Sequence, residues 1–128
     1  MKRHASTAAI IAAISLTAVL PAAAQTRTLD TFVTEANRVP LNPTAMLRSD
    51  GRRLAGEFRA SLDTVRTEVR TARAAGRTPP ACPAGKVEVN PQELLRFLNA
   101  IPQAERVRMT PTDGIRTWLA SRYPCPAA

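Results

Sequence analysis

Two cysteines, Cys82 and Cys125, are the residues of this sequence whose type and spacing most directly suggest a chemical role. Two cysteines can form a disulfide, contribute to a metal site or remain free thiols. A zinc site of two cysteines and two histidines is excluded, because the only histidine is His4. In an exported chain an even cysteine count is typical of a disulfide. We therefore predict a Cys82–Cys125 disulfide, which would stabilise the fold by about 4 kcal/mol.

Groups suited to catalysis are sparse. No imidazole other than that of His4 is present to act as a base for a serine or cysteine nucleophile. The carboxylates of Glu57, Asp63 and Glu68 are spaced so that they do not share one helix face, and we expect them to pair with neighbouring arginines. The sequence has no glycine-rich phosphate loop and no zinc-ligand spacing. We predict that the protein is not an enzyme and uses no cofactor or metal.

The N-terminus has the pattern of a secretory signal peptide. Lys2 and Arg3 precede an apolar run over residues 8–20, and small residues lead up to Gln25. The run is shorter than the roughly 20 residues that a membrane-spanning helix needs. We predict that residues 1–24 are a cleaved signal peptide and that residues 25–128 form a single domain. The expected location is the periplasm, without a membrane anchor.

The net charge is positive. The full sequence has 18 basic and 10 acidic residues, a net charge of +8. Without Lys2 and Arg3 the charge is +6, and Lys86 is then the only lysine among the basic residues. Such a charge suits an anionic partner or is simply a solvated surface. Aromatic residues for base stacking are few, so we do not expect nucleic acid binding.

Helical spacing of apolar residues dominates the rest of the chain. We expect a first helix over residues 28–38, a second beginning at Pro43 after an Asn42 cap, and a long third helix over residues 52–75. The second helix either kinks near Asp50 or restarts with Asp50 as a cap. Gly76 is expected to end the long helix.

Prolines and caps divide the C-terminal half. Residues 77–85 contain three prolines and are predicted to form a rigid loop that carries Cys82. Asn90 and Thr110, each followed by a proline, mark the starts of two further helices. No long alternating run is present. The predicted fold class is all-α, a small bundle of four or five helices stapled by one disulfide.

Three stretches together resemble a known family. They are the helix segment 58–63, the proline-flanked Cys82 with the apolar residues after it, and an ending with Pro102, Arg106, an apolar helix and Tyr123-Pro124-Cys125. In these stretches the chain resembles the Rap/Tai family of periplasmic immunity proteins. Members of that family are small helical proteins that neutralise cell-wall amidase toxins delivered by type VI secretion.

The resemblance implies a protein partner, a peptidoglycan amidase effector, whose active site the chain would occlude. The proline-bounded segments 77–85 and 102–111 are the rigid candidates for contact, unless they are ordinary surface connections. They and their flanks hold four candidate partner-binding residues: Arg77, Lys86, Arg106 and Arg108. The alternative is a small envelope protein of the same fold that binds anionic partners through its arginines. A homodimer is left open.

Overall fold

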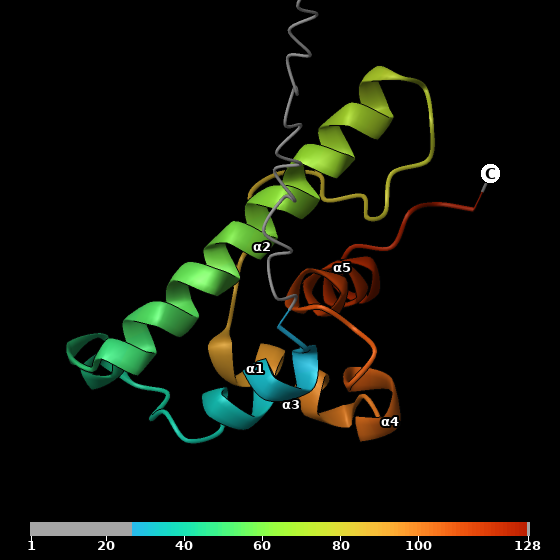
Figure 1. The fold of residues 1–128 in the computed structure, drawn as a ribbon. Helices are drawn as coiled ribbons and strands as arrows, with labels where there is room; N and C mark the ends of the chain where they lie inside the picture. The colour runs from blue at the N-terminus through green and yellow to red at the C-terminus, as the bar shows by residue number, and fades with distance from the viewer. Residues whose placement is uncertain (1–26, 128) are drawn as a thin grey trace, which may run out of the picture.

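The computed structural model describes residues 27–127, and these form an all-α bundle without strands (Figure 1). The predicted fold class is therefore confirmed. The predicted signal peptide, residues 1–24, lies outside the described residues. Within residues 27–127, none of the helices combines the length and the hydrophobicity that a membrane-spanning segment requires. The elements, in chain order, are α1 (Leu29–Ala36), the 3₁₀ helix η1 (Pro43–Leu47), α2 (Ser49–Ala74), α3 (Pro91–Ala100), α4 (Gln103–Arg106) and α5 (Pro111–Arg122).

The predicted capping residues begin their helices. The Asn42 side chain accepts from the N–H of Thr44 at the start of η1. The Asn90 side chain accepts from two N–H groups at the start of α3, and Thr110 and Asp113 form a reciprocal capping box on α5. Each cap satisfies N–H groups that have no partner inside the helix. These starts follow from local sequence alone.

Helix boundaries differ from the prediction by one to three residues, since α1 covers Leu29–Ala36 and α2 covers Ser49–Ala74. The chain restarts near Asp50, which was one of the two predicted alternatives, but Asp50 is not the cap: it lies inside the first turn of α2 and pairs with Arg48. The acidic residue there suits the positive end of the helix dipole without being the cap. The connector 102–111, predicted to be a rigid segment, contains the short helix α4.

The core lies between the long helix α2 and the shorter helices α1, α3 and α5, which lie on one side of it in Figure 1. α2 has 26 residues and is therefore about 39 Å long. Most apolar residues along one side of α2 are buried, whereas Phe58 is half-buried. The helix packs mainly against α5, which buries Trp118 and Leu119. Gly114 on α5 leaves room for α1, because a Cβ there would come within 2.7 Å of Leu29 Cδ1.

Candidate functional site

The segment after α2 has no helix or strand, yet several bonds fix its position. We call residues 77–87 the tied loop. Cys82 forms a disulfide with Cys125 in the C-terminal segment, which confirms the predicted pairing. The N–H of Cys82 donates to the carbonyl of Tyr123 at 2.8 Å, and Ala81 is only 1% exposed. The middle of the loop is thus bonded to the C-terminal segment and packed against the core.

Helix α2 holds the tied loop from the other side. Gly76 ends the helix with a φ of 67°, a conformation that glycine adopts without steric cost, as predicted for this position. The N–H of Arg77 then donates to the carbonyl of Ala72 at 2.8 Å. Further along, the Arg73 guanidinium donates to the carbonyl of Pro83 at 3.0 Å. The loop is therefore anchored at its start and again at its middle.

A hollow of about 310 Å³ lies between α2 and the tied loop. Buried apolar residues, among them Val69, Val87 and Leu119, line part of it. Its lining contains no carboxylate and has four cationic residues: Arg66, Arg70, Arg73 and Lys86. We call this feature the basic hollow. The three arginines share one face of α2, because residues three or four positions apart are neighbours on a helix.

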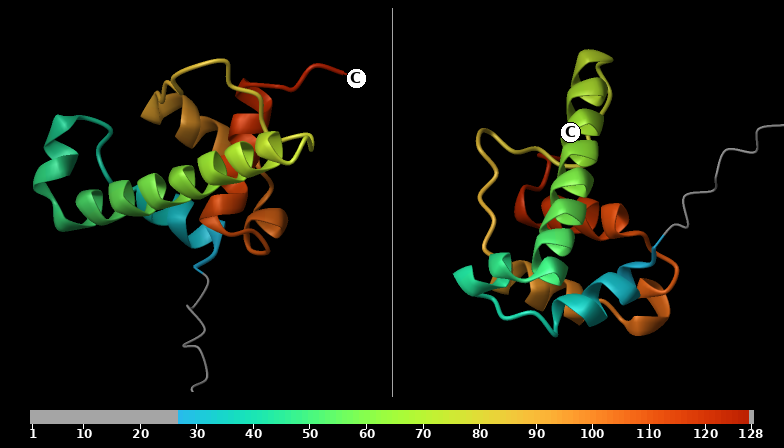
Figure 2. Two further views of the ribbon diagram at one scale, coloured as in Figure 1. Left: turned by 90° about the horizontal axis from the view of Figure 1, so that it is seen from above. Right: turned by 60° about the vertical axis from the view of Figure 1, so that its left-hand side comes forward.

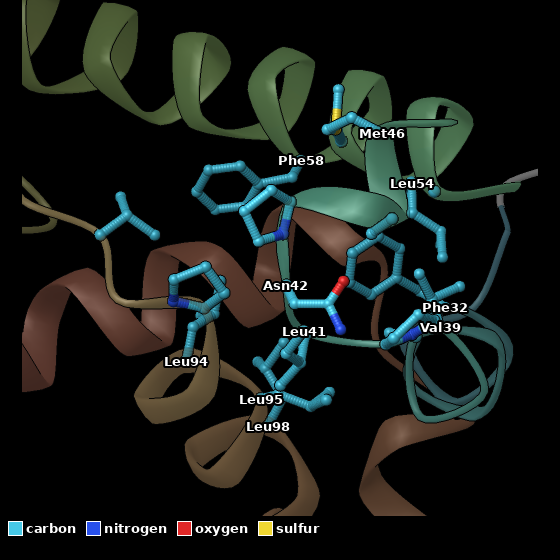
Figure 3. Close-up of a pocket in the computed structure, with 18 residues that line it drawn as sticks. Phe32, Val39, Leu41, Asn42, Met46, Leu54, Phe58, Leu94, Leu95 and Leu98 are labelled. Carbon is cyan, nitrogen blue, oxygen red and sulfur yellow. The ribbon is translucent and has the colours of Figure 1, made fainter. Parts of the chain in front are cut away.

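A second, larger feature is an apolar groove of about 480 Å³ among α1, η1, α2 and α3 (Figure 3). Asn42 is the only residue in its lining with a polar side chain. Leu41 and Met46 are each 43% exposed at this groove. Gly51 allows η1 to lie close to α2, because a Cβ there would be only 2.1 Å from the carbonyl oxygen of Ala45. The sequence analysis did not anticipate this groove.

The four candidate partner-binding residues do not form one surface. Arg77 and Lys86 are exposed on the tied loop. Arg106 and Arg108 belong to the α4 region, at the other end of the molecule (Figure 1). The Arg106 side chain is only 15% exposed, and it bonds to Asp30 and to two backbone carbonyls. Its guanidinium therefore holds α4 to α1 and the end of α3, whereas Arg108 is exposed.

The three carboxylates considered for catalysis each pair with arginine, and for Glu57 and Asp63 the partner is a neighbouring arginine, as expected. Asp63 lies 3.4 Å from Arg66, one turn away on α2. Glu68 instead pairs with Arg116 on α5, a partner distant in sequence. Hydrogen bonding to Arg116 lowers the pKa of Glu68 below its ordinary value. Among residues 27–127 no group of three histidine, cysteine, aspartate or glutamate side chains is arranged to hold a metal ion.

Sequence reasoning missed the basic hollow, although part of its signal is visible. Arg66, Arg70 and Arg73 are spaced by four and three residues, which is the spacing of one helix face. The tied loop that closes the hollow could not be placed from sequence. Its position depends on the disulfide and on the bond between Arg73 and Pro83.

Comparison with known proteins finds no match: no family model, no curated protein and no solved structure is significantly similar to the chain.

Proposed function

We propose that the chain is a binding protein that inhibits a cell-wall amidase, with the tied loop as the element that enters the active-site cleft. The observation that carries this proposal is the anchoring of the tied loop. It lacks regular secondary structure, but it is held by the Cys82–Cys125 disulfide and by hydrogen bonds from Arg73 and Cys82. An inhibitor loop that is already fixed loses little conformational entropy when it binds.

The position of the tied loop also suits this role. The last turns of α2, from which the loop starts, rise beyond the other helices in the right-hand view of Figure 2. Thr78, Ala84, Gly85 and Lys86 are exposed along the loop. The start of the loop therefore projects together with the end of α2, and such an element can enter a concave site that a flat surface cannot reach. Interfaces of standard size depend on a few such inserted groups.

The same proposal places the mature chain in the periplasm. A disulfide persists in an oxidising compartment and is rare in the cytosol, so the Cys82–Cys125 bond supports export. Peptidoglycan amidases act on the cell wall, in the compartment that an exported inhibitor would share. Location and proposed partner are therefore consistent with each other.

The experiment is co-expression of the chain with the product of the neighbouring gene, followed by an assay of peptidoglycan amide hydrolysis. We expect a stable complex in which hydrolysis is blocked. The matched variants are Ala84→Trp on the tied loop and Ala104→Trp on α4, two exposed alanines given the same bulky side chain. Ala84→Trp should relieve the inhibition and Ala104→Trp should not. A complex that leaves hydrolysis unchanged would contradict the proposal.

A further inference from the structure

The basic hollow has four positively charged residues in its lining, and contacts within the fold do not explain all of them. Like charges at close range repel each other, and no carboxylate lines the hollow. The helix dipole favours a cation in the last turn of α2, where only Arg73 lies. Asp63 offsets Arg66 at 3.4 Å. Neither effect explains Arg70, whose guanidinium bonds to the Thr67 hydroxyl at 3.2 Å and remains exposed.

Lys86 adds the fourth charge from the opposite wall. It belongs to the tied loop, and the loop is fixed against α2 by the disulfide and by the Arg73–Pro83 bond. The cations of the helix and the cation of the loop therefore face one space in a defined arrangement. A negatively charged ligand would therefore meet cations that are already positioned, so little conformational entropy is lost in arranging them.

We propose that the basic hollow binds the carboxylate side chain of an acidic segment on a partner protein. Arginine guanidinium groups bind a carboxylate through paired hydrogen bonds, and Lys86 contributes a further cation. The more accessible apolar parts of the lining, Pro83 and Ala84, contact the methylene groups of a glutamate or aspartate side chain. The proposal rests on the proposed function, because it names the chemistry that the tied loop meets on its partner.

The shape of the site favours a peptide over other anionic partners. A membrane surface contacts projecting cations and does not need a hollow with an apolar lining. Nucleic acid binding without sequence preference uses aromatic platforms, and the lining of the basic hollow contains no aromatic residue. A volume of about 310 Å³ also exceeds the space that a bare carboxylate or phosphate group fills. An acidic side chain together with its stem suits both the charge and the lining.

The test uses the processed, disulfide-bonded chain and the peptide acetyl-Leu-Glu-Glu-Leu-amide, with its glutamine counterpart as control. Titration is followed by the NMR amide shifts of Val87 and Leu119. The double variant Arg70→Gln/Lys86→Gln removes two charges and leaves Arg73 to hold the loop. The control variant Arg38→Gln/Arg96→Gln removes two exposed charges from other segments. Thermal melts establish that both variants remain folded.

We expect the glutamate peptide to bind weakly and to shift Val87 and Leu119. Binding should fall about tenfold for the glutamine peptide and for Arg70→Gln/Lys86→Gln, since each loses charged hydrogen bonds. The variant Arg38→Gln/Arg96→Gln should bind like the unmodified chain. Equal binding of the two peptides would overturn the proposal. Binding to phosphatidylglycerol vesicles, but not to the peptide, would also overturn it and assign the charge to a membrane surface.

Failure of this inference and failure of the proposed function give different results. If Arg70→Gln/Lys86→Gln inhibits an amidase as well as the unmodified chain does, the carboxylate site is wrong and the inhibitor role stands. If the glutamate peptide binds at the basic hollow while no amidase is inhibited, the site stands and the inhibitor role is wrong.

Discussion

Arg116 on α5 binds Glu68 on α2 through two parallel hydrogen bonds, with Nε–Oε2 and Nη2–Oε1 distances of 2.8 and 2.7 Å. The same guanidinium reaches Asp113 through Nη1 at 2.7 Å. The pair joins the two helices that form the largest contact in the fold. The two bonds fix how α5 lies along α2, because a planar guanidinium can donate both of them only to a carboxylate in one orientation.

Glu68→Gln should lower stability modestly. The Glu68 side chain is 36% exposed, so solvent screens the pair and the expected loss is about 1 kcal/mol, or about 5 °C in Tm. The control is Glu88→Gln, an exposed residue outside the helices. Thermal unfolding of both variants provides the measurement. Equal Tm values for the two variants would show that the Arg116 pair contributes nothing measurable.

Acid should destabilise the fold through the same cluster. Hydrogen bonds from Arg116 lower the pKa of Glu68 below its ordinary 4.5, and the backbone N–H of Thr110 lowers that of Asp113 below its ordinary 3.8. As the pH falls, the unfolded chain therefore takes up protons before the folded chain does. Stability is fully present above these ordinary values and is lost as the pH falls through the lowered ones.

Urea unfolding at about pH 7 and about pH 3 measures this effect, and we expect a lower unfolding free energy at the acidic pH. Glu68→Gln is the internal control, because it removes one of the two carboxylates. Its loss of stability on acidification should be smaller than that of the unmodified chain. A loss of the same size in both would assign the pH dependence to other carboxylates.

The disulfide should contribute more to stability than any ion pair. Cys82→Ser opens a loop whose closure removes about 4 kcal/mol of entropy from the unfolded state, so Tm should fall by well over about 10 °C. The tied loop should also lose its fixed position, since only hydrogen bonds and packing remain to hold it. Thermal melts with and without thiol reductant give the same comparison in the unmodified chain. A Tm that reductant leaves unchanged would contradict this expectation.

Local sequence predicted the features that depend on neighbouring residues. The caps at Asn42, Asn90 and Thr110 act on N–H groups two or three residues away, and the Gly76 helix end needs only its own backbone. The disulfide joins residues distant in sequence, but it was predicted from the even cysteine count in a chain expected to be exported, and two cysteines allow a single intramolecular pairing. None of these features requires knowledge of how the helices pack.

The features that sequence missed depend on tertiary contacts. Glu68 and Arg116 are far apart in sequence, and helical spacing alone suggested nearer partners for Glu68. The apolar groove depends on the close approach of the η1 backbone to Gly51. The spacing of apolar residues in the sequence does not indicate this contact. Arginine is usually a surface residue, but the guanidinium of Arg106 contacts α1 and the end of α3.

Arg106 and Arg108 should respond differently to substitution. Arg106 bonds to Asp30 and to the carbonyls of Asn99 and Ile101, so Arg106→Ala removes the donor from three acceptors, and the bonds to Asp30 and Ile101 are partly buried. We expect a loss of about 2 kcal/mol. Arg108→Ala removes an exposed side chain and should change stability by less than about 0.5 kcal/mol. Urea unfolding distinguishes them, and equal losses would contradict the structural role of Arg106.

Two glycines of α2 should give opposite results when each is changed to alanine. A Cβ on Gly51 would lie 2.1 Å from the carbonyl oxygen of Ala45 and 2.9 Å from its carbonyl carbon. These are backbone atoms, so relief requires η1 to move away from α2 and the apolar groove to change shape. A Cβ on Gly56 meets nothing within 4 Å. Gly56→Ala should therefore stabilise the helix by about 0.5–1 kcal/mol, because alanine has less backbone entropy to lose.

Gly51→Ala should instead destabilise the fold by about 1–3 kcal/mol, the usual cost of inserting a group into a filled space. Chemical denaturation of both variants measures the difference, and the NMR shifts of Leu41 and Met46 report whether η1 moves. Stabilisation by Gly51→Ala without any shift at these residues would mean that η1 does not pack against α2 at this distance. The groove would then be wider in solution than the contact of Gly51 with Ala45 implies.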